Sequence, residues 1–292
     1  MSVHTVLISC LQFLKFTGSE MYVLELAKQL KQLNCNVDIA AARVGEPLAN
    51  IAKQNGINCY ELNDLPQKTY DVIHCQHTPV VEYLIQKYPN TPKVSTIHSE
   101  VISLENPVAH QSIKHYIAVR PSIKDFIINK FNIEEKNITI IYNPIDEKKF
   151  ICKSTKDHNS ILFVGTLDYL RKSTIFDLID YTKQQNKQLW IIGHDQSDYA
   201  SELLKHDHVY YQDALVDVEK YVQRCTETAG ILLGRTTIEG WLCGKSGWIY
   251  NVDEQGNIID KKLHSPPNDL EKFYASNVAK QIKQIYENIL QN

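Results

Sequence analysis

Residues 234–245, Gly-Arg-Thr-Thr-Ile-Glu-Gly-Trp-Leu-Cys-Gly-Lys, combine residue types that bind phosphates and sugar hydroxyls. The apolar residues 231–233 before them have the pattern of a buried strand. Thr236 or Thr237 can cap a helix, and Gly244 stands where that helix would end in a left-handed turn. A strand, a polar loop and a helix N-terminus bring backbone N–H groups and the positive end of the helix dipole together, which suits a phosphate.

Glu239 limits what this helix mouth can hold. A carboxylate beside a phosphate repels it unless the carboxylate points at a neutral polar group such as a sugar hydroxyl. We therefore hypothesise a nucleotide or sugar-nucleotide site in which Glu239 binds ribose hydroxyls. The alternative is an ordinary helix N-terminus, in which the helix dipole stabilises a first-turn acid.

The composition is that of an ordinary globular protein. Of 292 residues, 43% are hydrophobic and 22% are charged, and this length accommodates two domains. The net charge of −3 gives no footprint for non-specific nucleic-acid binding. No apolar run approaches the roughly 20 residues of a membrane span, and the N-terminus lacks the features of a signal peptide. We expect a cytoplasmic protein, with peripheral membrane contact left open.

The cysteines favour the same location. There are seven, spread widely and without a CxxC pair, so we expect reduced thiols.

Apolar segments alternate with amphipathic segments along the whole chain. In the first half, the strand-like segments are residues 3–10, 36–42, 58–62, 71–75, 93–98, 116–119 and 137–142. The pattern restarts with residues 160–165, 188–193, 209–212, 230–233 and 247–252. Apolar strands separated by helical segments indicate a parallel sheet covered by helices on both faces. We therefore predict an α/β protein of two tandem, Rossmann-like, doubly wound domains with a cleft between their strand ends.

A polar, lysine-rich stretch at residues 147–159 is the predicted interdomain linker. We expect an N-terminal domain over residues 1–150 and a C-terminal domain over residues 151–275. The remaining residues, 276–292, form an amphipathic helix that we expect to pack back towards the N-terminal domain.

A second candidate phosphate site follows the strand at residues 160–165. Gly165 ends that strand, and Arg171 and Lys172 lie in the loop predicted after it. Without the preceding strand, Arg171 and Lys172 would be an ordinary solvated pair of loop residues. Because ligands of doubly wound sheets bind at the carboxyl ends of strands, this position favours a phosphate-binding role.

In these features the chain resembles the retaining GT-B glycosyltransferases of family 4, which use nucleotide sugars. The motifs that carry the resemblance occur in the expected order over nearly the whole chain: Thr17-Gly18-Ser19-Glu20 before a helix, DVIHCQHT, VSTIH, YIAV, ITIIYNPID, ILFVGTL followed by RKS, LWIIG and IEGWLCGK.

The resemblance implies the GT-B arrangement, in which two domains face each other across a cleft and a C-terminal helix crosses back. It implies a nucleotide-diphosphate sugar bound mostly by the C-terminal half, an acceptor on the N-terminal half, and transfer with retention and without a metal or cofactor. Arg171 or Lys172 would stabilise the leaving diphosphate. The acceptor stays open among a glycan, a lipid-linked sugar, a protein and, as a minor option, a modified DNA base.

The resemblance also implies roles for single residues. Glu239 would contact ribose, Gly193 and His194 would lie near the base, His98 would lie near the reacting sugar, and Gly18 would let the backbone approach the diphosphate or the acceptor. The predicted catalytic residues are His98, Arg171 and Lys172. The predicted donor-binding residues are Gly18, Gly165, Gly193, His194, Arg235, Thr236, Thr237 and Glu239.

The chain departs from the family pattern at three places. The family usually carries two glutamates separated by seven residues, and the first position here is Ile231, which removes an expected contact with the donor sugar. Thr166 replaces an arginine after the strand-end glycine. Asn143-Pro144 replaces the Asn-Gly of the hinge.

Other functions stay open on the same residues. A sugar-nucleotide epimerase would need several acid/base carboxylates and histidines in the cleft, whereas a catalytically silent binding protein would hold nucleotide weakly or not at all. His98 can also be a structural histidine bonded to the backbone. The pairs His74/His77 and His206/His208 have spacings found in metal sites, but no predicted helix presents the first pair on one face and the second lies in a charged loop. We therefore expect no metal.

Overall fold

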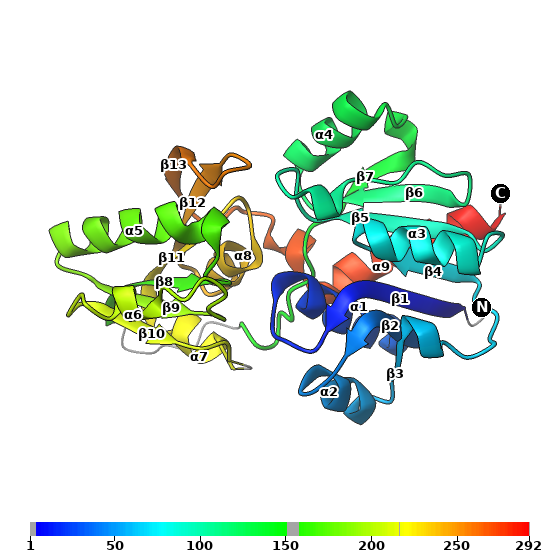
Figure 1. Cartoon of the computed structure of the whole chain (residues 1–292), viewed down its shortest axis with the longest axis horizontal. Coiled ribbons are helices and arrows are strands. Elements are labelled where there is room, and N and C mark those ends of the chain that lie inside the picture. The colour runs from blue at the N-terminus through cyan, green and yellow to red at the C-terminus, as the bar shows by residue number, and fades with distance from the viewer. Residues whose placement is uncertain (1–3, 151–157, 216, 292) are drawn as a thin grey trace. The chain divides into compact units, whose positions relative to one another are not determined.

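The computed structural model of the chain describes residues 4–150, 158–215 and 217–291. The chain divides into two α/β units (Figure 1). The N-terminal unit contains the residues up to 15, residues 19–144 and the residues from 272 onwards. The C-terminal unit contains residues 16–18 and 145–271.

The N-terminal unit is built on a parallel sheet with the strand order β3-β2-β1-β4-β5-β6-β7. The central strands are rich in apolar residues and are covered on both faces, so their side chains are almost completely buried. The order reverses between β1 and β4, which makes the carboxyl ends of these two strands the topological switch point. The strands are β1 (Thr5–Phe13), β2 (Asn36–Val44), β3 (Asn58–Glu61), β4 (Val72–Cys75), β5 (Lys93–Ile97), β6 (Ile113–Ala118) and β7 (Ile138–Ile140).

Helices connect these strands, and local sequence signals define several helix ends. Pro79 and Pro121 lie in the first turns of α3 and α4, where a missing N–H costs nothing. At the other end of α3, the buried Lys93 ammonium donates hydrogen bonds to the carbonyls of Tyr88 (2.5 Å) and Thr91 (2.9 Å). The helices are α1 (Gly18–Gln32), α2 (Leu48–Gln54), α3 (Thr78–Lys87), α4 (Pro121–Phe131) and α9 (Ala275–Gln291), with short 3-10 turns η1 (Leu62–Asp64), η2 (Ser103–Glu105), η3 (Glu135–Asn137) and η4 (Leu270–Phe273).

The C-terminal helix α9 packs within the N-terminal unit. Its face carrying Val278, Ile282 and Tyr286 is fully buried. The Tyr286 hydroxyl lies 2.6 Å from Nδ1 of His74 on β4, and the Lys283 ammonium donates to a backbone carbonyl just after α1. A buried polar contact therefore fixes the register of a helix that is distant in sequence from its sheet.

The C-terminal unit repeats the same winding, with the strand order β10-β9-β8-β11-β12-β13 and a reversal between β8 and β11. Strand β13 runs antiparallel to β12 at the sheet edge and was not predicted, because three of its seven residues are charged. The strands are β8 (His158–Val164), β9 (Gln188–Ile192), β10 (Val209–Gln212), β11 (Cys225–Ile231), β12 (Ser246–Val252) and β13 (Ile258–His264), and the helices are α5 (Tyr169–Gln184), α6 (Ala200–Leu203), α7 (Glu219–Val222) and α8 (Arg235–Leu242).

Two glycines let the ends of β8 and β9 approach each other closely. A Cβ atom placed on Gly193 would lie 1.8 Å from the carbonyl oxygen of Gly165, a distance that no real side chain tolerates. The backbone N–H of Gly165 in turn donates to the carbonyl of Ile192 (3.0 Å). Glycine at position 193 is therefore a steric requirement of the sheet.

None of the helices in residues 4–150, 158–215 and 217–291 has both the length and the apolar character needed to cross a bilayer.

Gly193→Ala should destabilise the C-terminal unit by about 3 kcal/mol, because the new methyl group meets backbone that cannot rotate away. Urea denaturation followed by circular dichroism measures the change. Gly18→Ala is the matched control, since a Cβ there meets no atom within 4 Å. An unfolding free energy for Gly193→Ala within about 0.5 kcal/mol of the parent would show that the two strand ends can separate without cost.

Candidate functional site

The candidate site of the C-terminal unit lies at the carboxyl ends of β8, β9 and β11. Gly165 follows β8, Gly193 and His194 follow β9, and Gly234 lies shortly after β11. Since β8 lies between β9 and β11 in the sheet, these three connections start at neighbouring positions along one edge. The sheet topology therefore brings the predicted donor-binding residues of this unit to its switch point.

Arg171 and Lys172 do not lie in a loop, as the sequence predicted, but in the first turn of α5. The helix begins early because the carboxylate of Asp168 caps it and accepts the Arg171 backbone N–H (3.1 Å). The Arg171 guanidinium also forms an ion pair with Asp168. An arriving phosphate would therefore share Arg171 with an acid that already occupies the N-terminus of α5.

Lys172 differs from Arg171 in its surroundings. Its ammonium lies over the rings of Tyr199 (5.4 Å to the centroid) and Phe176 (5.7 Å), a cation–π arrangement. The residue is exposed, and within the described part of the chain its ammonium forms no ion pair. Lys172 therefore presents a positive charge that an anion can use without displacing a carboxylate.

Helix α8 begins at Arg235, with Gly234 as its N-cap, so the predicted caps Thr236 and Thr237 are wrong. Thr236 instead donates its hydroxyl to the carbonyl of Val164 (2.9 Å), which ties the first turn of α8 to the end of β8. Leu232, in the connection before the helix, has a left-handed φ of 54°, uncommon for a leucine. Gly244 has a φ of 73°, and this confirms the predicted left-handed helix end.

Thr237 faces the sheet. Its side chain is fully buried, and a Cβ on Gly247 of β12 would lie only 2.7 Å from its Cγ2. Thr236 and Thr237 therefore dock α8 onto its sheet, and the backbone N–H groups at this helix mouth are donors suited to a phosphate.

Glu239 is buried, with 5% of its surface exposed, and forms an ion pair with Arg235 one turn earlier (3.2 Å). It lies in the second turn of α8, so the alternative of a first-turn acid stabilised by the dipole does not apply. A buried carboxylate is costly unless its charge is balanced. Arg235 supplies that balance, and the pair presents a near-neutral polar surface rather than an isolated charge.

His194 is close to an acid that the sequence analysis missed. Asp213 follows β10, the neighbour of β9 in the sheet, and its Oδ1 lies 3.6 Å from Nδ1 of His194. The position of Asp213 directly after a strand-like segment was the available signal.

In the N-terminal unit, the structure holds His98 tightly at the end of β5. Its backbone N–H donates to the carboxylate of Glu105 (3.2 Å), and its carbonyl accepts from Arg120 (3.2 Å). Its Nε2 contacts Oε1 of Gln76, and the Tyr22 ring meets the imidazole edge-on at 4.8 Å. Burial lowers the pKa of His98 to about 4, so its imidazole is neutral at pH 7.

Glu105 and His77 were not predicted as site residues, although the loop containing His77 follows a strand. Nδ1 of His77 accepts the backbone N–H of Leu11 (3.1 Å), so its Nε2 carries the proton and faces Glu105 (3.3 Å). His77 also has a φ of 65°. Burial raises the pKa of Glu105, but the hydrogen bond from His77 and the proximity of His98 hold it below its usual value.

His74 is completely buried in the core. Its Nδ1 contacts the Tyr286 hydroxyl and its Nε2 contacts the Thr96 hydroxyl, each at 2.6 Å, and burial lowers its pKa to about 3. No group of three or more His, Cys, Asp or Glu arranged to hold a metal occurs in the residues that the structure describes.

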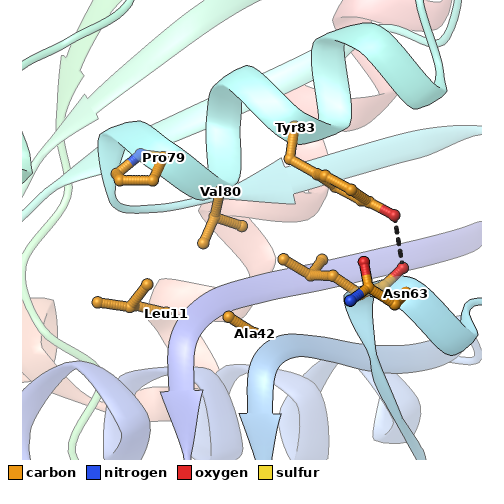
Figure 2. A pocket seen from close by; sticks show the side chains of 7 residues that line it. Leu11, Ala42, Asn63, Pro79, Val80 and Tyr83 are labelled. Atoms are coloured by element: carbon orange, nitrogen blue, oxygen red, sulfur yellow. Dashed lines mark hydrogen bonds between the residues drawn. The ribbon is translucent and has the colours of Figure 1, made fainter.

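A pocket of about 220 Å³ opens at the same end of the N-terminal sheet (Figure 2). One wall is the first half of α3, whose Tyr83 donates its hydroxyl to the Leu62 carbonyl (2.8 Å). Leu11 on β1 lines the pocket and also bonds His77, so the pocket adjoins the histidine cluster. Its lining residues are Leu11, Ala42, Leu62, Asn63, Pro79, Val80 and Tyr83.

Residues 16–149 match the family model described as Glycosyltransferase Family 4. None of the curated proteins matches the sequence. Among solved structures, a glycosyltransferase from Rickettsia africae aligns over 100% of both chains with 14% identity and a TM-score of 0.69.

Two further structures contain ligands. HepE of Anabaena, in complex with UDP-glucose, aligns over 99% of both chains with 16% identity and a TM-score of 0.68. The pneumococcal O-GlcNAc transferase GtfA, in complex with UDP and GlcNAc, aligns over 100% of both chains with 10% identity and a TM-score of 0.72. These likenesses confirm the predicted GT-B fold over the whole chain, and the matched residues confirm the resemblance to family 4.

The two buried histidines should make the N-terminal unit sensitive to acid. The folded-state pKa values of His74 and His98, about 3 and 4, lie below the ordinary value of 6.5. Between about pH 6.5 and pH 4 the unfolded chain therefore binds protons that the folded chain does not. As the pH falls through that window, each histidine should lower the free energy of unfolding by up to ~1.4 kcal/mol per pH unit.

Urea denaturation between pH 4.5 and 7.5 measures this slope. His74→Gln should flatten it, whatever its effect on stability at pH 7, whereas His206→Gln, in a partly exposed loop of the other unit, should keep the parent slope. A parent protein whose unfolding free energy does not change across this range would contradict the assignment of neutral, buried imidazoles.

Proposed function

We propose that this chain, whose residues 16–149 match the family 4 glycosyltransferase model and whose fold is GT-B, moves a sugar from a nucleotide-diphosphate sugar to an acceptor hydroxyl. The observation that carries the proposal is the convergence of three strand connections at the switch point of the C-terminal sheet. They bring together a cationic helix start, the N–H groups of a second helix and a buried Arg–Glu pair.

Each part has a role that follows from its charge. The Lys172 ammonium, together with Arg171, attracts the diphosphate and stabilises the charge that grows on it as the glycosidic bond breaks. The N-terminal N–H groups of α8 add hydrogen bonds to phosphate oxygens. Glu239 accepts hydrogen bonds from the ribose hydroxyls, and Arg235 keeps its charge from repelling the adjacent phosphates.

Two of the similar structures favour uridine as the base. HepE is in complex with UDP-glucose and GtfA with UDP and GlcNAc, and both share the fold over essentially the whole chain. We therefore propose a UDP-sugar as the donor, with the base near Gly193 and His194. In the N-terminal unit, His98 is the group that we assign to the reacting sugar, and its low pKa makes it a neutral hydrogen-bonding partner rather than a cation.

The cluster of Glu105, His77 and His98 is the observation that keeps an epimerase as a second candidate, because epimerisation needs acid/base groups. Thermal-shift measurements with UDP-, GDP- and ADP-sugars test nucleotide binding first. Product analysis then separates the two enzymes, since a transferase releases the nucleoside diphosphate and an epimerase returns an altered nucleotide sugar. If none of the sugar nucleotides stabilises the protein, both candidates fail and a silent binding protein is left.

Lys172→Ala should weaken UDP binding about tenfold, because it removes a positive charge that forms no ion pair with the acids the structure describes. Isothermal titration with UDP measures the dissociation constant. Lys183→Ala, an exposed lysine near the other end of α5, is the control and should bind UDP as the parent does. Equal dissociation constants for Lys172→Ala and the parent would place the diphosphate elsewhere.

Glu239→Gln should weaken UDP binding about tenfold while the protein stays folded. If the lost contacts are to ribose, the penalty should shrink to under about twofold when UDP is replaced by its 2′,3′-dideoxy analogue, which lacks the hydroxyls. Glu202→Gln, an exposed acid on α6, should show neither effect. A tenfold penalty that persists with the dideoxy analogue would exclude the ribose as the partner of Glu239.

A further inference from the structure

Gln76 carries a buried side-chain amide, and the oxygen and nitrogen of that amide differ in their hydrogen bonding. It follows β4 at the switch point of the N-terminal sheet, and none of its surface is exposed. Its Oε1 contacts Nε2 of His98. Within the residues that the structure describes, its Nε2 has no hydrogen-bond partner.

An unpaired N–H in this position is costly. Burying an amide donor without a partner lowers stability by about 1–3 kcal/mol, and an apolar side chain of similar size would avoid that cost. Packing therefore gives no reason for glutamine at position 76. Its contact with His98 does, because an amide oxygen can only accept a hydrogen bond.

That contact determines which ring nitrogen of His98 carries the proton. With Oε1 of Gln76 as its partner, Nε2 must be the protonated nitrogen, and Nδ1 keeps its lone pair. A neutral imidazole with this tautomer accepts a hydrogen bond at Nδ1, and a sugar hydroxyl can supply one. The opposite tautomer would offer a donor at Nδ1 and favour an anion instead.

We propose that Gln76 is a positioning residue that fixes the Nε2–H tautomer of His98 and so prepares Nδ1 to accept a hydrogen bond from a sugar hydroxyl of the substrate. The proposal rests on the proposed function for the role of His98, but not for its tautomer. It adds a specificity element for an uncharged, hydroxyl-bearing group in the N-terminal unit.

The other groups around His98 are compatible with this assignment. Glu105 and Arg120 bond its backbone and leave the choice of ring tautomer to the side-chain contacts. The side chain of Asn143 also hydrogen-bonds the His98 side chain, which raises the pKa of His98 against the larger effect of burial. The titratable or charged groups that act on His98 or pack against its ring are Glu105, His77, His74, Arg120 and Tyr22.

The test uses the full chain labelled with ¹⁵N in its histidine rings, observed by two-bond ¹H–¹⁵N correlation spectra, in which the two tautomers have distinct patterns. The signals that disappear in His98→Gln identify His98. Gln76→Met removes both ends of the amide at similar volume. Gln76→Glu keeps the acceptor and adds a charge, and Gln86→Met, at an exposed position of α3, is the matched control.

In the parent, His98 should show the Nε2–H pattern. Gln76→Met should give a mixture of tautomers and a kcat for sugar transfer at least about tenfold lower, with the KM for the donor changed less than about twofold. Its melting temperature should change little, because removal of the unpaired amide N–H offsets the loss of the hydrogen bond to His98. Gln76→Glu should raise the pKa of His98 by at least about one unit.

An Nδ1–H pattern in the parent, or a Gln76→Met protein with unchanged tautomer and unchanged kcat, would overturn the proposal. Gln76→Met activity that falls only in proportion to folded protein would also overturn it, since a purely structural role predicts that result. If the parent transfers no sugar from any nucleotide sugar, the function proposed above fails. The spectra of the parent and of Gln76→Glu then still decide the tautomer and its cause.

Discussion

Parallel β-sheets impose the constraint on which the candidate site depends. A parallel strand needs cover on both faces, so most of its side chains pack in the core, and the polar groups that can reach a ligand lie where the strands end. In both units the strand order reverses once, between β1 and β4 and between β8 and β11. In the N-terminal sheet, such a connection carries Gln76. In the C-terminal sheet, the connections on either side of the reversal carry Gly165 and the start of α8, which are far apart in the sequence and share a sheet edge because of this winding.

The charges at these edges are balanced within the protein. Arg171 pairs with Asp168, and Glu239 pairs with Arg235, so two of the three cations expected to hold a phosphate or flank one are shared with acids before any ligand arrives. Lys172 rests on two aromatic rings instead. In the N-terminal unit, His74 and His98 are neutral. Both ring nitrogens of His74 and Nε2 of His98 are in hydrogen bonds.

The sequence predicted the elements that depend on local patterns. Long apolar runs such as that of β1 identify buried strands, and Gly244 identifies a left-handed helix end, because both signals depend on residues within one element. Helix starts were harder. Asp168 begins α5 three residues before Arg171, and Gly234 rather than a threonine caps α8, since Thr236 finds a better partner in the Val164 carbonyl. Strand β13 was missed because its charged residues are compatible with an edge strand but indicate none.

By itself, the sequence determined the α/β class, the two sheets and the strand ends at which polar residues collect, because periodicity and strand-end position are properties of short segments. Tertiary structure alone decided the partners: Glu239 with Arg235, His77 with Glu105 and the backbone of Leu11, and Gln76 with His98. Such pairings set protonation, tautomer and available charge. They depend on burial and on distances between segments that only the winding of the sheet brings together, and no local pattern in the chain encodes them.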